Sequence, residues 1–152
     1  MRKILAIAAV TLLLAGCASK PAAKPLNIVK GITIATGGLT VGQCLTKEAA
    51  TGAVGLAQAT DCAKPHFGEV MSAGKIRTVG DKFDEAKIAE LSNNFCIKSF
   101  ETFAGLRYDK SSLQMFPLVP SSKSWLNADR IVTCIVYDQN QLTTGSLKGA
   151  NR

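Results

Sequence analysis

The side chains best suited to chemistry in this sequence are five cysteines and a single histidine, His66. Any Ser-His-acid or Cys-His arrangement must include His66, because it is the only imidazole in the chain. The nearby acids Asp61 and Glu69, and the more distant Asp129, show no pattern that brings two of them together for acid–base work. The sequence contains no nucleophile elbow, phosphate loop or paired-metal motif.

The Pro65-His66 step is typical of the start of a strand, with the imidazole hydrogen-bonded to the loop behind Cys62. We therefore predict a structural role for His66, no catalytic residues, and neither a cofactor nor a metal. A hydrolase that uses His66 with an acid is the alternative. It would require His66 in a cleft, within about 3–4 Å of a carboxylate or hydroxyl.

Four of the cysteines lie beyond residue 40, and none belongs to a CxxC pair. With one histidine in the chain, a zinc site would need four ligands from distant segments without a recognisable spacing. Two disulfides are the expected state in an oxidising compartment, with three connectivities open. These cysteines are Cys44, Cys62, Cys96 and Cys134.

The N-terminus indicates that compartment. Residues 1–16 read MRKILAIAAVTLLLAG, a basic start and an apolar run that ends in small residues, as in a secretory signal. The run is shorter than the roughly 20 apolar residues that span a bilayer. Residues 14–17, LAGC, resemble the lipobox of bacterial lipoproteins. We expect removal of residues 1–16 and acylation of Cys17, palmitate included; a generic signal peptide with Cys17 as an incidental thiol is the alternative.

A lipidated Cys17 would hold the chain on the outer face of a membrane, because several acyl chains bind far more firmly than one. Ala18 follows instead of aspartate, which by resemblance to known sorting favours the outer membrane in a two-membrane cell and otherwise leaves the cell membrane. Residues 17–38 contain prolines, lysines and small residues without a period, as in a flexible tether. Whether the β-prone residues 28–34 join a sheet is left open.

The 152-residue chain has a formal charge of +7, which falls to +5 when Arg2 and Lys3 are removed. The other basic residues are scattered among acids, without the basic clusters and interleaved aromatics that nucleic acid requires. Nucleic acid is therefore excluded as a partner. About 135 residues remain, which suits one domain with one modest core, expected over residues 39–150.

The clearest element is a helix over residues 83–103. Apolar residues recur there at helical spacing, and Asp81 or Asp84 can cap its start. The apolar stripe indicates a core face. In residues 131–137 the odd and even positions alternate between two faces of a strand. Further strands are expected at residues 39–45, 54–59 and 66–76, with a proline-limited edge strand at 113–120.

Strands, one long helix and strands again indicate an α+β fold, a small antiparallel sheet with one long helix packed on a face. Cys96 lies mid-helix and Cys134 mid-strand, so a disulfide between them would join helix to sheet. A Cys44–Cys62 disulfide would then close the N-terminal strand pair. Each closure contributes roughly 3–4 kcal/mol by loop entropy. The tail from Gln139 is polar and basic, and we expect it to be loosely held.

A series of short segments runs in a fixed order through residues 41–149. The segments are VGQC at 41–44, TDCAKPHFGEV at 60–70, Cys96, Pro120 and Trp125 ahead of DRIVTC at 129–134, and GSLKG at 145–149. In this order they resemble the septum-formation domain of bacterial exported proteins. The resemblance implies a membrane-attached extracytoplasmic domain with a link to cell division. Ala128 stands where the family usually has glycine.

Trp125 and Arg130 join His66 as candidate binding or structural residues. A single Trp in a small domain is either a core side chain or an exposed platform, and we favour the core, with Trp125 covering the Cys96–Cys134 region. Arg130 is expected to pair with Asp129 or Asp61 in a partly buried network.

Taken together, the sequence predicts a lipid-anchored, non-catalytic binding or scaffold domain, linked to cell division or envelope maintenance. Its expected partners are the membrane, through the lipid, and an envelope protein or cell-wall polymer. A cell-envelope hydrolase that uses His66 is the alternative.

Overall fold

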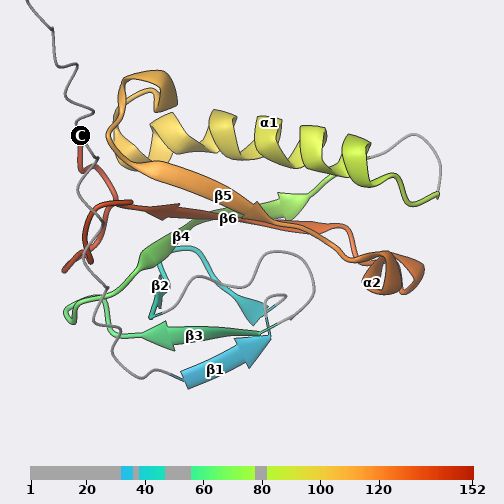
Figure 1. Cartoon of the computed structure of the whole chain (residues 1–152), viewed down its shortest axis with the longest axis horizontal. Coiled ribbons are helices and arrows are strands. Elements are labelled where there is room, and N and C mark those ends of the chain that lie inside the picture. The colour runs from blue at the N-terminus through green and yellow to red at the C-terminus, as the bar shows by residue number, and fades with distance from the viewer. Residues whose placement is uncertain (1–31, 36–37, 47–55, 78–81) are drawn as a thin grey trace, which may run out of the picture.

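The computed structural model describes residues 32–35, 38–46, 56–77 and 82–152 of the chain. Strands come first, a long helix follows, and two more strands flank a short helix (Figure 1). In order, the elements are β1 (Ile32–Ala35), β2 (Cys44–Leu45), β3 (Leu56–Thr60), β4 (Gly68–Lys75), α1 (Glu85–Ala104), the 3-10 turn η2 (Tyr108–Lys110), β5 (Gln114–Leu118), α2 (Ser122–Leu126) and β6 (Ile131–Tyr137).

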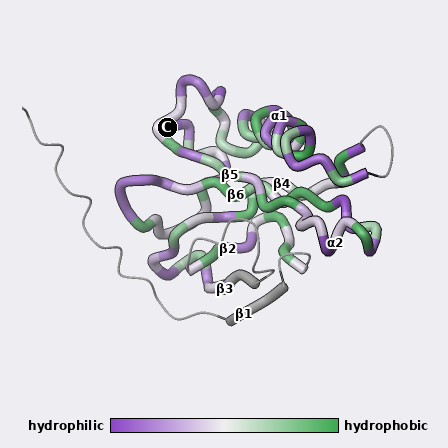
Figure 2. Tube along the Cα trace, turned by 45° about the vertical axis from the view of Figure 1, so that its right-hand side comes forward, coloured by the Kyte–Doolittle hydropathy of each residue, from purple (hydrophilic) through white to green (hydrophobic). Residues whose placement is uncertain are grey.

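The six strands form one antiparallel sheet in the order β1-β3-β2-β4-β6-β5. Helix α1 lies across one face of β4, β6 and β5, whereas β1, β2 and β3 curl away on the other side (Figure 1). The most hydrophobic stretches coincide with the central strands between these layers (Figure 2). The predicted α+β fold is confirmed.

Helix α1 begins where Asp84 caps it, by accepting a hydrogen bond from the backbone N of Lys87 at 2.9 Å. It ends at Gly105, whose φ of 81° only glycine adopts readily. A Cβ at Gly105 would also lie 2.5 Å from the side chain of Asn151. The predicted apolar stripe is a core face, and its buried residues are Ile88, Cys96, Phe100, Phe103 and Ala104.

Strand β6 separates two hydrophobic clusters. Val132, Cys134 and Val136 belong to the cluster under α1. Ile135 belongs to the second cluster, on the opposite face. The predicted alternation of this strand is therefore confirmed. The second cluster also contains Leu39, Leu45, Val70 and Leu118.

The two edge strands of the sheet are β1 and β5. Residues 32–34 do join the sheet, as part of β1 paired with β3, while residues 28–31 lie outside the described residues. Strand β5 is the opposite edge, in keeping with Pro117, which lacks an N–H for a further partner.

Both predicted disulfides are present. Cys96 in α1 is bonded to Cys134 in β6 with a Cα–Cα distance of 5.5 Å, which fixes the helix to the sheet. Cys44 in β2 is bonded to Cys62, just beyond β3, at a Cα–Cα distance of 5.3 Å. The two disulfides thus tie α1 to β6 and β2 to the segment that follows β3.

Candidate functional site

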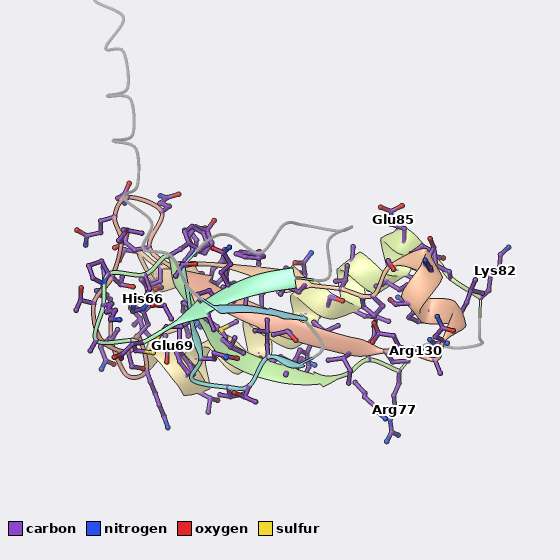
Figure 3. All side chains as sticks on the ribbon, turned by 90° about the horizontal axis from the view of Figure 1, so that it is seen from below. His66, Glu69, Arg77, Lys82, Glu85 and Arg130 are labelled. Atoms are coloured by element: carbon purple, nitrogen blue, oxygen red, sulfur yellow. A yellow bond between two sulfur atoms is a disulfide. The ribbon has the colours of Figure 1, made fainter. Side chains whose placement is uncertain are left out.

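The residues that the sequence singles out lie at two ends of the domain (Figure 3). His66 and Glu69 occupy one end, at the start of β4. Arg130 lies at the other end, with Arg77, Lys82 and Glu85. The two ends therefore have to be considered as separate candidate sites.

His66 is fully buried and bonded at both ring nitrogens. Its Nδ1 lies 2.8 Å from the carbonyl oxygen of Lys64, and its Nε2 lies 3.1 Å from Oγ1 of Thr143. A carbonyl oxygen only accepts, so Nδ1 carries a proton and donates to it; in the neutral imidazole, Nε2 then accepts from the Thr143 hydroxyl. The backbones of His66 and Thr143 also exchange two hydrogen bonds, each of 2.9 Å. The imidazole thus joins residues 77 positions apart.

Glu69, three residues after His66, is also buried, with 1% of its surface exposed. Its carboxylate accepts hydrogen bonds from the hydroxyl of Ser146, at 2.8 and 3.0 Å, and from the backbone N of Leu147 at 2.6 Å. A buried carboxylate is costly unless such donors surround it. Glu69 therefore depends on the segment that follows β6.

That segment is firmly attached, so the expectation of a loosely held tail is wrong. The backbone N of Gly145 donates to Cys62 O at 2.7 Å, and Leu147 is buried in the cluster under α1. Further on, Gly149 N and Asn151 N donate to carbonyls at the end of α1, at 2.7 and 2.8 Å. We call residues 143–152 the C-terminal latch. Its polar and glycine residues give no local signal in the sequence, because the contacts that attach it are with segments far away along the chain.

An ion pair holds the last residue of the latch. Arg152 lies 2.7 Å from the carboxylate of Asp138, which is buried. Burial raises the pKa of Asp138, but hydrogen bonds from the Asn140 backbone, Arg152 and Gln141 outweigh it, so its pKa is held below the ordinary value of 3.8. Asp138 therefore stabilises the fold in its charged form.

This end of the molecule is built for structure rather than for a reaction. The hydroxyl that the hydrolase alternative requires near His66 is present as Thr143, but the imidazole has no exposed surface for a substrate to reach. The geometry does not favour the hydrolase. Within the described ranges, no group of three or more His, Cys, Asp or Glu side chains is placed to hold a metal ion.

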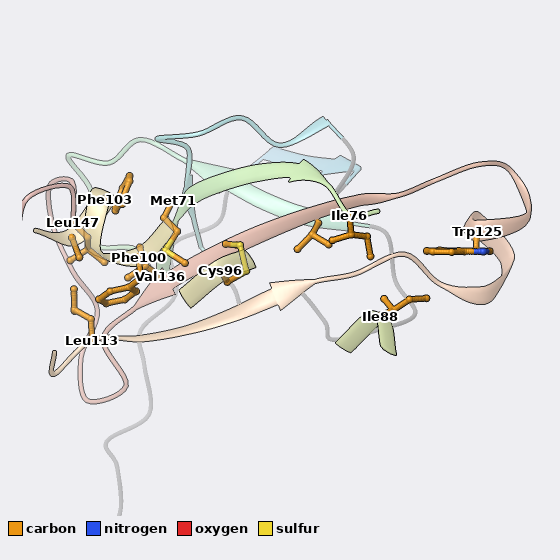
Figure 4. Packing of buried hydrophobic residues seen from close by; sticks show 13 residues of the cluster. Met71, Ile76, Ile88, Cys96, Phe100, Phe103, Leu113, Trp125, Val136 and Leu147 are labelled. Carbon is orange, nitrogen blue, oxygen red and sulfur yellow. A yellow bond between two sulfur atoms is a disulfide. The ribbon is translucent and has the colours of Figure 1, made fainter. Parts of the chain in front are cut away.

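At the opposite end, Trp125 is a core side chain, 2% exposed. Phe83 packs against its ring at 77°, with centroids 5.9 Å apart, and the guanidinium of Arg130 lies 3.4 Å from its centroid. Trp125 lies far from the Cys96–Cys134 disulfide, with Ile76 between them in the view of Figure 4. It closes the outer end of the core instead of covering the disulfide as we expected.

Arg130 lies in a partly buried hydrogen-bond network as expected, but its partners are not the expected acids. Its guanidinium donates to the carbonyl oxygens of Trp125 at 2.9 Å and Asp129 at 2.8 Å. The carboxylate of Asp129 accepts from the backbone N of Ile131 instead, and the ion pairs of the described residues do not join Arg130 to Asp129 or Asp61. Arg130 therefore fixes the turn after α2 rather than neutralising an acid.

An open cleft of about 510 Å³ lies beside this end of the core. Phe83 and the first turns of α1 form one wall, and the residues from the end of β5 to the start of α2 form the other. Sequence reasoning missed this cleft, because its two walls are 30 or more residues apart and, of its lining residues, only Pro120 belongs to the motifs. Its lining consists of Phe83, Glu85, Ile88, Ala89, Val119, Pro120, Ser121, Ser122 and Lys123.

The expected lipidation site, Cys17, and the tether lie outside the described residues. Among the residues that are described, none of the helices combines the length and the apolar character needed to cross a membrane. Anchoring through Cys17 stays a prediction.

Comparison with known protein families matches residues 41–152 to the family described as septum formation. The match includes both disulfides, the His66 and Glu69 end, the C-terminal latch and the cleft. No curated protein and no solved structure matches the chain. Because the family match covers most of the chain, this protein belongs to the septum-formation family.

Proposed function

We propose that this protein is a lipid-anchored binding module of the cell envelope that takes part in cell division without catalysing a reaction. The division-related part follows from membership of the septum-formation family. The anchor follows from the lipobox-like sequence before Cys17, and the exported location agrees with two disulfides in the fold.

One observation carries the non-catalytic part of the proposal. The polar residues of the family segments, His66 and Glu69, are buried and bonded to the C-terminal latch, so these segments build a rigid body. A rigid, disulfide-bridged body with an open cleft suits binding, because little conformational entropy is lost when a partner docks. For a cell-envelope hydrolase that uses His66, the Thr143 hydroxyl lies within reach of the imidazole, but the imidazole is fully buried, which weighs against this alternative.

Depletion of the protein in its own bacterium tests the proposal. We expect elongated cells with delayed or misplaced septa, restored by the wild-type gene and restored less well by Cys17→Ser, which removes the lipid. A fluorescent fusion of the wild-type protein should gather at division sites. Normal division after depletion would contradict the division role, and full rescue by Cys17→Ser would contradict the need for the anchor.

A further inference from the structure

We infer that the cleft between the start of α1 and the residues before α2 binds a short peptide of the bacterial cell-wall polymer, one that carries a free ammonium and a free carboxylate. The inference rests on the proposed envelope function for the source of the peptide. The shape and charge of the cleft supply the rest.

The interior of the cleft is apolar and firmly supported. Phe83, Ile88 and Val119 line it. Phe83 is held by its edge-to-face contact with Trp125, and Ile88 is 2% exposed within the main core. A volume of about 510 Å³ falls within the range of roughly 300–1,000 Å³ that is usual for small-ligand sites. The cleft can therefore accept a few small side chains, such as alanine, without rearrangement.

The two walls carry opposite charges. Glu85 stands on the α1 wall and Lys123 on the α2 wall, and both side chains are exposed. In the described part of the chain, neither takes part in an ion pair, with each other or with a third residue. A ligand with an ammonium toward Glu85 and a carboxylate toward Lys123 would complement both walls.

These features favour a peptide over other envelope ligands. A sugar ring usually stacks on an open aromatic face, whereas Phe83, the aromatic residue that lines the cleft, is partly buried and packed edge-to-face against Trp125. A uniformly anionic polymer would meet the carboxylate of Glu85 inside the cleft. The peptides of the cell wall consist of small and charged residues with free amino and carboxylate groups, which matches the apolar interior and the mixed rim.

The test uses the full chain with Cys17→Ser, which is purified without detergent, and a synthetic cell-wall tetrapeptide of alanine, γ-linked glutamate, diaminopimelate and alanine. We expect NMR titration to shift the amide signals of Ile88, Ala89 and Lys123 and to leave those of His66 unchanged. Glu85→Gln and Lys123→Gln should each weaken binding about fivefold, the upper range for an exposed ion pair. The matched controls Glu101→Gln and Lys98→Gln, at exposed positions of α1 outside the cleft lining, should bind as the parent does.

Chemical variants of the peptide make the assignment specific. Acetylation of its two amino groups, at the N-terminus and on diaminopimelate, should weaken binding to the parent about fivefold but add nothing in Glu85→Gln, because that variant has already lost the ammonium's partner. Amidation of its carboxylates should likewise weaken binding to the parent but add nothing in Lys123→Gln, because that variant has already lost the carboxylate's partner.

Three results would overturn the inference: no shifts at millimolar peptide, shifts centred on another face, or equal losses in the cleft variants and the controls. Equal binding of an α-linked peptide of the same charges built only from L-residues would overturn the cell-wall assignment. Failure of the proposed function is a separate result, since a protein that gathers at septa without binding the tetrapeptide would refute only this inference.

Discussion

The carboxylate of Glu69 accepts a hydrogen bond of 2.6 Å from the backbone N of Leu147, which lies 78 residues further along the chain. The contact joins β4 to the C-terminal latch at a point where both residues are buried. Ser146 adds its hydroxyl to the same carboxylate. Loss of either partner would leave a polar group buried without a hydrogen bond, so the start of β4 and the latch stabilise each other.

Glu69→Gln should lower the free energy of unfolding by about 1–2 kcal/mol, because the carboxylate accepts from two donors, the Ser146 hydroxyl and the backbone N of Leu147, and an amide offers only one accepting oxygen. Urea denaturation of the purified domain measures this. Glu101→Gln is the control, since Glu101 is exposed and its side chain has no hydrogen bond among the described residues. Equal stabilities of the two variants would show that the Glu69 contacts contribute nothing.

His66→Ala should lower the free energy of unfolding by about 2–4 kcal/mol, through two lost hydrogen bonds and the cavity left by the imidazole. In cells, the division defect of this variant should follow the loss of folded protein, as measured by its abundance and melting temperature. An unchanged melting temperature with a complete loss of function would instead support a reaction centred on His66.

The two disulfides should contribute unequally to the free energy of unfolding. Cys96→Ala with Cys134→Ala opens a loop with a sequence separation of 38 and should cost about 2–5 kcal/mol. Cys44→Ala with Cys62→Ala opens one with a separation of 18 and should cost about 0.6 kcal/mol less by loop entropy. Cys96 and Cys134 are buried whereas Cys62 is partly exposed, so mild reductant should open Cys44–Cys62 first. Alkylation of the freed thiols and peptide mapping show which disulfide is reduced first.

Ala128 has a φ of 60°, in the left-handed region where residues other than glycine are strained. The glycine that the family resemblance leads one to expect at this position would adopt such a φ without strain. The strain is about 1–2 kcal/mol, and glycine gives back about 0.5–1 kcal/mol in backbone entropy, so Ala128→Gly should stabilise the protein by about 0.5–1 kcal/mol. Ala89→Gly, in the interior of α1, should instead destabilise it by about 1 kcal/mol. A fall in melting temperature for Ala128→Gly would contradict the argument.

The depressed pKa of Asp138 predicts a pH dependence of stability. Because the folded-state pKa lies below the unfolded value, the contribution of Asp138 is complete above the ordinary pKa of 3.8 and is lost as the pH falls through the folded pKa. Wild type should therefore exceed Asp138→Asn in stability at about pH 7, and the difference should shrink toward about pH 2. Chemical denaturation at several pH values measures the two stabilities. A stability difference that stays constant over this range would contradict the assigned ionisation of Asp138.

Several elements could be predicted from the sequence, because the signals for them are local. Helix α1 is marked by its apolar period and by Asp84, and strand β6 by the alternation that separates Cys134 from Ile135. Once those two elements were located, the Cys96–Cys134 disulfide followed from their positions. Pro117 in turn marked β5 as an edge strand.

The roles of Trp125, Arg130 and the latch could not be predicted in this way. Helix α2 is only five residues long, and its capping serines resemble any polar turn. Arg130 bonds to backbone oxygens, which every residue possesses, so no acid in the sequence marks its partner. The latch has neither an apolar period nor a run of β-branched residues.

The sequence by itself determined the α+β fold, the disulfide pairing and the family, because periodicity, cysteine placement and ordered motifs are properties of short segments. Only the tertiary structure decided that Glu69 is held by Leu147, that Thr143 bonds to His66, and that α1 and the residues before α2 enclose a cleft. These contacts join positions tens of residues apart. Their energy comes from burial and hydrogen bonding between segments, which no single segment encodes.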